Sequence, residues 1–96
     1  MKAYLVLDLT VNDMDGFREY IAEIPAYISK HSGQYIVPGV QPTVIEGDWK
    51  PERVVIIEFQ TRDKAEAFLA DREIQGLFNI RHTTSTSRLL LVDGCT

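Results

Sequence analysis

The chain has 96 residues, of which 45% are hydrophobic and 25% charged, and its formal net charge is −4. This composition is typical of an ordinary globular protein, and the length predicts one domain over residues 1–96. Without a run of lysine and arginine, nucleic acid and anionic membranes are not expected partners. The apolar runs of four or five residues are far shorter than the ~20 residues that span a bilayer.

The cysteine content and the first residues bear on the compartment. Cys95 is the only cysteine, so no internal disulfide can form, and a free thiol fits a reducing compartment. Met1-Lys2 leads directly into strand-like sequence, without the apolar core of a secretory signal. We therefore expect a cytoplasmic protein.

The first two predicted elements are a strand and a helix. Residues Ala3 to Val11 alternate, with Ala3 and the three leucines on one face. Asn12 or Asp13 can cap a helix whose apolar positions recur every three or four residues: Met14, Phe17, Tyr20, Ile21, Ile24, Tyr27 and Ile28. Pro25 predicts a kink or break near Ile24, and Gly33 predicts a left-handed stop.

The middle of the chain is predicted as extended. Segments 34–37 and 43–46, with a turn at Pro38-Gly39, indicate a hairpin or a bent strand. Gly47-Asp48 then forms a turn, because glycine accepts a positive φ and aspartate can bond to nearby backbone. Residues 53–60 are rich in Val, Ile and Phe and form the strongest predicted strand.

The last third is predicted as two helical segments and a strand. Thr61 can cap a helix with Ala65, Phe68 and Leu69 facing inward. A second segment starts near Asp71 and carries an inward set: Ile74, Leu77, Phe78 and Arg81. Residues 83–87 are a polar connection, and residues 88–92 are the last strand.

The order βαββαβ predicts an α+β, ferredoxin-like fold, a four-stranded antiparallel sheet with the helices on one face. Within it, we expect the first and third strands side by side at the centre and running parallel. Their outer faces would carry Tyr4, Val6 and Asp8, and Val54, Ile56 and Glu58. A solvated face should be mostly polar, but this one is half aliphatic, which predicts a homodimer formed by packing the two sheets together.

The chain resembles a known family. The run E-G-D-W-x-P-x-R-V-V-I-I-E-F at residues 46–59, the opening A-Y-L-V-L-D-L-T strand, the helix containing Pro25, and Gly33 are similar to the 1330 family of domains of unknown function. That family often has two glycines where this chain has Ser32-Gly33. The resemblance implies the fold and a dimeric α/β barrel, but no reaction, since the family itself is unassigned.

Asp8 and Glu58 are the first candidate for catalysis. On adjacent parallel strands both would lie near the same end of the sheet, and two close carboxylates cannot both ionise freely, so one could serve as a general base. The alternative, which we favour, is that they form ion pairs with Arg88, Arg53 or an arginine of a second subunit.

Trp49, with Glu46 and Arg53, is the second candidate. An indole and a guanidinium could together hold a small acid or an aromatic ligand. Alternatively, Trp49 anchors the turn to the sheet or to a partner, and Arg53 pairs with Glu46 or stacks on the ring. We favour the anchoring role.

The first helix offers the third candidate. Tyr20 and Tyr27 lie on its apolar stripe, and together with His31 and Tyr35 they are predicted to line a pocket between helix and sheet. In that setting His31 is a candidate acid or base. The alternative is that the two tyrosines are core residues and that His31, in the last turn of the helix, suits the helix dipole as a cation. No histidine has a second ligand at metal-binding spacing, and no glycine-rich phosphate loop is found, so we expect neither a metal nor a cofactor.

Two functions remain open at this stage. By analogy with other dimeric α/β barrels, the first is a cofactor-independent small-molecule enzyme, such as an oxygenase or isomerase. The second is a non-catalytic ligand-binding or regulatory module that holds a small acid with Trp49 and Arg53.

Overall fold

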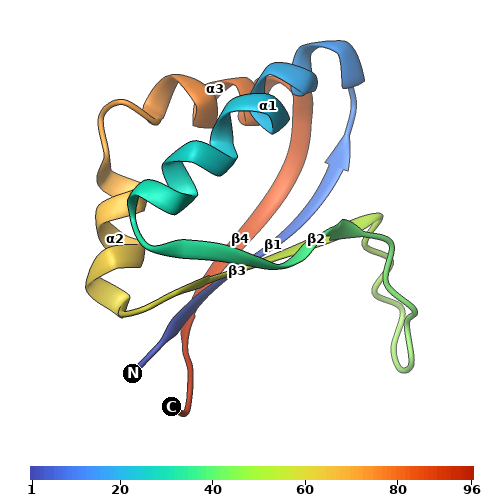
Figure 1. Ribbon diagram of the computed structural model, residues 1–96. Coiled ribbons are helices and arrows are strands. Elements are labelled where there is room, and N and C mark those ends of the chain that lie inside the picture. The colour runs from blue at the N-terminus through green and yellow to red at the C-terminus, as the bar shows by residue number, and fades with distance from the viewer.

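The computed structural model describes residues 1–96 and contains seven helices and strands. They are β1 (Ala3–Val11), α1 (Met14–Lys30), β2 (Gly33–Val40), β3 (Arg53–Phe59), α2 (Arg62–Ala70), α3 (Gln75–Thr84) and β4 (Ser85–Asp93). All three helices lie on one face of the curved sheet (Figure 1). The predicted ferredoxin-like βαββαβ arrangement is confirmed.

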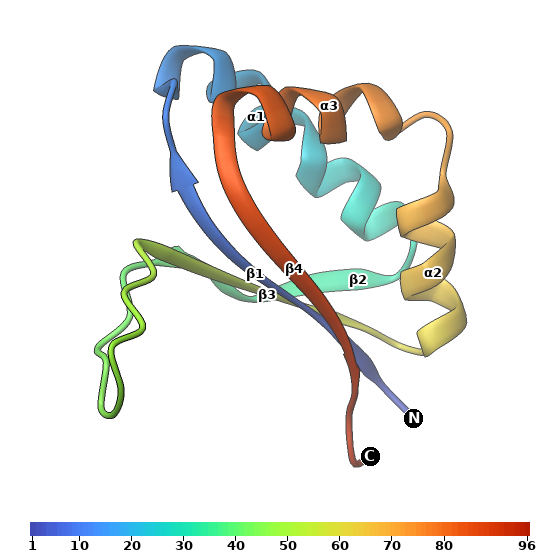
Figure 2. The same cartoon turned by 180° about the vertical axis from the view of Figure 1, so that it is seen from behind.

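The sheet has the strand order β2-β3-β1-β4, and every neighbouring pair is antiparallel. β1 and β3 do lie together at the centre, as expected, but the prediction that they run parallel was wrong. One crossover separates β1 from β2, which makes those two strands parallel, and β3 lies between them in the opposite direction. Viewed from behind, β1 and β4 cross the sheet together and both chain ends leave at the same end (Figure 2).

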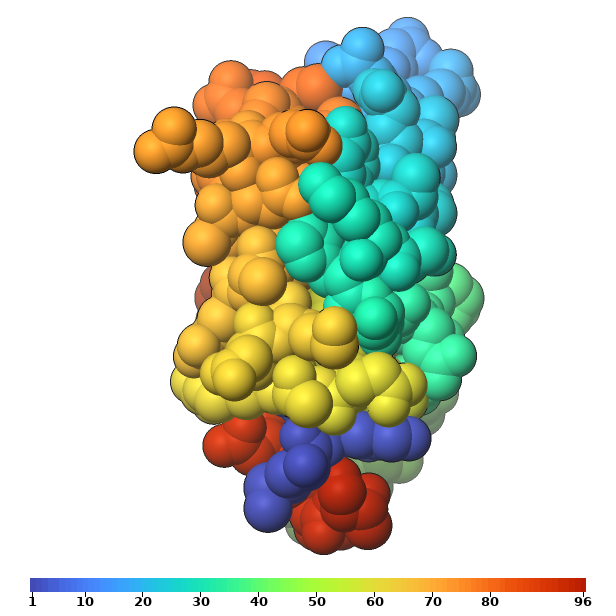
Figure 3. Space-filling view, turned by 60° about the vertical axis from the view of Figure 1, so that its left-hand side comes forward, coloured from blue at the N-terminus to red at the C-terminus, as the bar shows by residue number.

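The core lies between the sheet and the helices. Alternation along β1 and β3 points Leu5, Leu7, Leu9, Val55, Ile57 and Phe59 toward the helices, where all six are buried. The apolar side of α1 meets them through Phe17, Tyr20, Ile24 and Ile28, and that of α2 and α3 through Phe68, Ile74, Leu77 and Phe78. The space-filling view shows α1 packed alongside α2 and α3, with the two termini adjacent at one end (Figure 3).

The predicted start of α1 agrees with the structure, but its predicted end does not. Asp13 is the N-cap, and its side chain accepts a hydrogen bond from the backbone N–H of Gly16. We predicted a kink or a break near Pro25; the helix continues unbroken through this residue, so a break is wrong. Ser32, with φ of 62°, takes the left-handed position expected of Gly33. Gly33 is instead required by packing, because a Cβ there would lie 2.7 Å from the Phe59 ring.

The segment between β2 and β3 differs most from prediction. β2 runs through Pro38 with two register shifts against β3, and no strand forms at residues 43–46. Residues 41–52 form an extended arm that leaves the sheet beyond β2 and β3 (Figure 1). Gly47 does have the expected positive φ, of 83°.

The second half of the chain is more regular than expected. Thr61 caps α2 as predicted. The predicted polar connection at residues 83–87 was wrong, because Thr84 ends α3 and β4 begins at once at Ser85. No helix is both long and apolar enough to cross a membrane.

Candidate functional site

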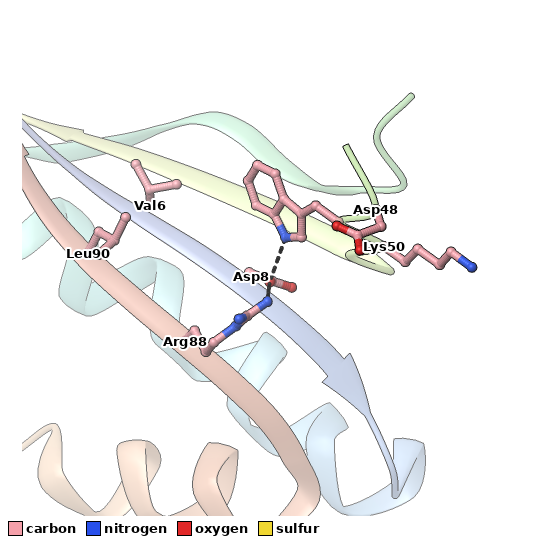
Figure 4. Close-up of a pocket in the computed structure, with 7 residues that line it drawn as sticks. Val6, Asp8, Asp48, Lys50, Arg88 and Leu90 are labelled. Carbon is pink, nitrogen blue, oxygen red and sulfur yellow. Dashed lines mark hydrogen bonds and ion pairs between the residues drawn. The ribbon is translucent and has the colours of Figure 1, made fainter. Parts of the chain in front are cut away.

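A wide groove lies on the outer face of the sheet, the face without helices. It has a volume of about 620 Å³ and is lined by Val6, Asp8, Asp48, Trp49, Lys50, Arg88 and Leu90. Strands β1 and β4 supply its floor and the arm supplies its rim (Figure 4). Asp8 accepts hydrogen bonds from Arg88, at 2.8 Å, and from the indole N–H of Trp49, at 3.3 Å. Asp8 and Arg88 on the floor of the groove therefore already have partners within the chain, whereas Asp48 and Lys50 on the arm form no ion pair.

The predicted pairing of Asp8 with Glu58 was wrong. The antiparallel register places Asp8 opposite Val54, and Glu58 opposite Tyr4. The two carboxylates share a face but are separated by four strand residues, or about 13 Å. The alternative interpretation holds for Asp8, which forms an ion pair with Arg88.

Glu58 has its own set of donors at the other end of the sheet. Tyr4 donates to Oε2 at 3.1 Å, Gln34 donates to Oε1 at 3.1 Å, and the Lys2 ammonium lies 3.3 Å from Oε1. Burial would raise the pKa of Glu58, but these three donors outweigh it and lower the pKa. A carboxylate stabilised in this way is a weak base, so the environment favours a structural role.

A second, smaller cavity lies on the opposite side of the sheet, beneath α1; we call it the inner pocket. It has a volume of about 100 Å³, and most of its lining is apolar. The lining residues are Leu7, Leu9, Phe17, Tyr20, Ile21, Ile24, Tyr35, Pro38, Gly39, Arg53, Val55 and Ile57. Its polar side chains are Tyr20 from α1, Tyr35 from β2 and Arg53 from β3. Apolar walls with a few polar groups are typical of small-molecule sites.

The three polar groups of the inner pocket are largely free of protein partners. Arg53 has no carboxylate within ion-pair distance, and the Tyr35 hydroxyl forms no hydrogen bond. Burial raises the pKa of Tyr35 to about 12, with a smaller contribution from Tyr20. Like an ordinary tyrosine, Tyr35 is a neutral hydrogen-bond donor at physiological pH, and its side chain is 38% exposed.

Of the four residues predicted to line a pocket, Tyr20 and Tyr35 do so and Tyr27 and His31 do not. Tyr27 is on the far turn of α1, half-buried at the edge of the core, with the Lys30 ammonium 6.0 Å from its ring centre. Because α1 rises along its axis, positions seven residues apart share a face but lie two turns apart.

His31 belongs to an ion-pair cluster at the end of α1. Its Nε2 lies 2.7 Å from Asp71, and Lys30 reaches both Asp71, at 3.1 Å, and Glu73, at 3.1 Å. The hydrogen bond to His31, the backbone N–H of Glu73 and the Lys30 ammonium lower the pKa of Asp71 to about 2. The cluster joins α1 to the connection between α2 and α3, away from both cavities.

Trp49 and Arg53 do not share a site. Trp49 lies over the outer face, whereas Arg53 lines the inner pocket, and no cavity has both in its lining. The expected ion pair of Arg53 with Glu46 is also absent. Within this chain Trp49 bonds to Asp8 on the sheet, which agrees with the anchoring role.

The hydrogen bond of Arg81 to a residue of the inner pocket was not predicted from the sequence. This side chain is 6% exposed, and its Nη1 donates to the Tyr20 hydroxyl oxygen at 3.3 Å. The signal was its position on the apolar stripe of α3, after Leu77 and Phe78, where a charged side chain is unusual. No group of three or more His, Cys, Asp or Glu side chains is placed to hold a metal ion.

Residues 2–95 match the model of the family described as Domain of unknown function (DUF1330), so the chain belongs to that family. The resemblance noted in the sequence is thereby confirmed. No match to this chain was found among curated protein sequences.

Several solved structures share the fold. A protein of unknown function from Rhodopseudomonas palustris has a TM-score of 0.80 at 12% identity, over 99% of this chain and 83% of that chain. SnoaB, a cofactor-independent oxygenase from Streptomyces nogalater, has a TM-score of 0.70 at 19% identity, over 99% of this chain and 94% of that chain. A dimeric ferredoxin-like protein of unknown function from Jannaschia sp. has a TM-score of 0.73 at 9% identity, over 98% and 100%. At these identities the similarity establishes the fold alone.

Proposed function

We propose that this protein binds a small organic molecule in the inner pocket, between β1, β3 and α1. One observation carries the proposal: apolar walls enclose three polar side chains, of which Arg53 and Tyr35 have no hydrogen-bond or ion-pair partner in the protein. Both side chains are partly open to solvent, with Tyr35 38% exposed, so a ligand that pairs with them would replace water in surroundings that are mostly apolar.

The outer groove supports a ligand site less well, although it is larger. Its carboxylate Asp8 is already bonded to Arg88 and Trp49, and its other charged side chains, Asp48 and Lys50, lie on the exposed arm. The groove also lies on an exposed apolar face, where Leu90 is 63% exposed and Val40 51% exposed. Such a face is better explained by a protein partner.

We infer that a second copy of the chain covers this face. Val6, Ile56 and Leu90 form one row across the three strands β3, β1 and β4, because Val6 is paired with the other two. An exposed apolar row can pack against its own copy in a two-fold arrangement. The Jannaschia protein with the same fold is described as dimeric, which supports this assembly.

A cofactor-independent reaction in the inner pocket is the second candidate function. It is favoured by a specific feature: Arg53 and the neutral Tyr35 could both donate to a developing oxyanion in apolar surroundings. SnoaB, with the same fold, is described as such an oxygenase. However, neither Asp8, Glu58 nor His31 lines the pocket, and no other carboxylate or imidazole does, so the protein supplies no evident base there. Binding is therefore the primary proposal.

A thermal-shift screen of small metabolites tests the binding site, because a ligand that binds only the native state raises its stability. Ile21 lies at the pocket mouth and is 46% exposed, so Ile21→Trp should obstruct entry at little cost to folding. Ala22→Trp, on the exposed side of the same turn, is the matched control. We expect a ligand found in the screen to raise the melting temperature of the native protein and of Ala22→Trp, but not that of Ile21→Trp. An equal rise in melting temperature in both variants would show that the ligand binds outside the inner pocket.

A further inference from the structure

The inner pocket has a cationic side chain behind it as well as one in its wall. Arg81 is 6% exposed, forms no ion pair, and its Nε has no hydrogen-bond partner. Its guanidinium carbon lies 5.8 Å from the Tyr20 ring centre and 5.2 Å from that of Phe78. Nη2 of Arg81 also lies 3.3 Å from Nε2 of His82. A buried cation with these neighbours and no carboxylate is uncommon, because burial of an unpaired charge is costly.

Arg81 fixes the direction of the hydrogen bond that Tyr20 can offer. A guanidinium has only donors, so the Tyr20 oxygen must accept from Arg81 Nη1. The hydrogen of the Tyr20 hydroxyl then has no acceptor in the protein, while the Tyr20 side chain lines the inner pocket. A ligand that reaches the Tyr20 hydroxyl can accept this hydrogen, and Arg81 makes the hydroxyl a stronger donor by withdrawing charge from the oxygen.

All three polar side chains of the pocket consequently act as donors. Arg53 contributes a positive charge, Tyr35 contributes a protonated hydroxyl, and Tyr20 carries the hydroxyl hydrogen left free by Arg81. No Asp, Glu or His lines the pocket to accept from a ligand or to balance the two arginines. The arrangement suits an acceptor with a negative charge and not a cation.

We propose that the ligand of the inner pocket is a small apolar anion, an oxyanion such as a carboxylate or enolate on an apolar body, and that Arg81 is a positioning residue for it. This rests on the proposed function and adds the chemical class of the ligand. The size follows from the volume: about 100 Å³ is somewhat less than the ~150 Å³ in which benzene is held. A single ring would fill the pocket, with its remainder in the open mouth beside Ile21 and Tyr35.

The test compares three one-ring probes: benzoate, its neutral analogue benzyl alcohol and the cation benzylamine. Titration of the native protein should give at least tenfold tighter binding of benzoate than of either other probe. Arg53→Gln should bring the benzoate to benzyl alcohol ratio close to one. Arg81→Met should reduce the ratio, and Arg81→Lys should restore part of it, which loss of packing alone would not do.

The outcomes separate this inference from the proposed function. If benzyl alcohol binds as tightly as benzoate and Ile21→Trp abolishes both, the pocket is a ligand site but the anion assignment is overturned. If no probe binds, or if Ile21→Trp has no effect on binding, the inner pocket is not the site and both proposals fail. If Arg81→Met fails to fold, Arg53→Gln and the native selectivity still decide the question.

Discussion

A charge on the outer face should break the proposed dimer, and Leu90 is the most informative place to put it. The side chain is 63% exposed, so Leu90→Glu costs the isolated chain little, as surface substitutions usually change stability by about 0.5 kcal/mol or less. In a sheet-to-sheet dimer the same side chain would be covered by the partner.

The size of the effect follows from that exposed fraction. Burying a whole leucine side chain contributes about 1.5–3 kcal/mol, so covering the exposed two-thirds of Leu90 contributes about 1–2 kcal/mol per copy. A two-fold interface contains the change twice, which gives about 2–4 kcal/mol, or a dissociation constant raised roughly 30- to 1,000-fold. Burial of two carboxylates moves the result to the upper end or beyond.

Sedimentation velocity over a dilution series measures this dissociation constant. Leu89→Glu is the matched control, because Leu89 is the next residue of β4, faces the other side of the sheet and is 36% exposed. We expect Leu90→Glu to be monomeric at concentrations where the native protein and Leu89→Glu are dimers. A Leu90→Glu dimer of native affinity, or a native chain that is already monomeric at micromolar concentration, would refute the proposed interface.

Three further predictions concern packing and titration. Gly33→Ala should lower the free energy of unfolding by about 1–3 kcal/mol in urea denaturation, since the added Cβ meets Phe59 at 2.7 Å; an unchanged midpoint would contradict the packing role. The folded pKa of Asp71 is lowered to about 2, so Asp71 should stabilise the fold above pH ~4 and cease to do so as the pH falls toward 2. Asp71→Asn should therefore flatten the acid side of the curve of stability against pH; an unchanged acid side would show that the bond to His31 contributes nothing. The folded pKa of Tyr35 is raised to about 12, so the fold should lose stability as the pH rises above ~10. Tyr35→Phe should lessen that loss when melting is measured against pH. An identical loss in both proteins above pH ~10 would show that the hydroxyl is not desolvated.

The fold could be predicted because local patterns and global packing agree. The alternation of residues 3–11, the Asp13 and Thr61 caps and the apolar stripe of α1 each correspond to an observed feature. Pro25 misled the prediction because its effect depends on the surrounding packing, which here keeps α1 continuous. Gly33 misled it because a glycine can be required by a close neighbour as well as by a positive φ.

The site was less predictable, because it depends on strand direction and on which face each residue takes. Treating β1 and β3 as parallel brought Asp8 and Glu58 together; the antiparallel register separates them. Sequence proximity likewise suggested a joint role for Trp49 and Arg53, which lie near opposite faces of the sheet. The bond between Tyr20 and Arg81 spans 61 residues and could not be inferred from any local pattern.

The most direct test of the account is to locate benzoate on the native protein by titration followed in methyl-resolved NMR spectra. Leu7, Ile24 and Val55 line the inner pocket, whereas Val6 and Leu90 line the outer groove on the other side of the sheet. We expect saturating shifts of the methyl signals of Leu7, Ile24 and Val55 and none of those of Val6 and Leu90. Shifts confined to Val6 and Leu90 would contradict it and assign ligand binding to the outer groove.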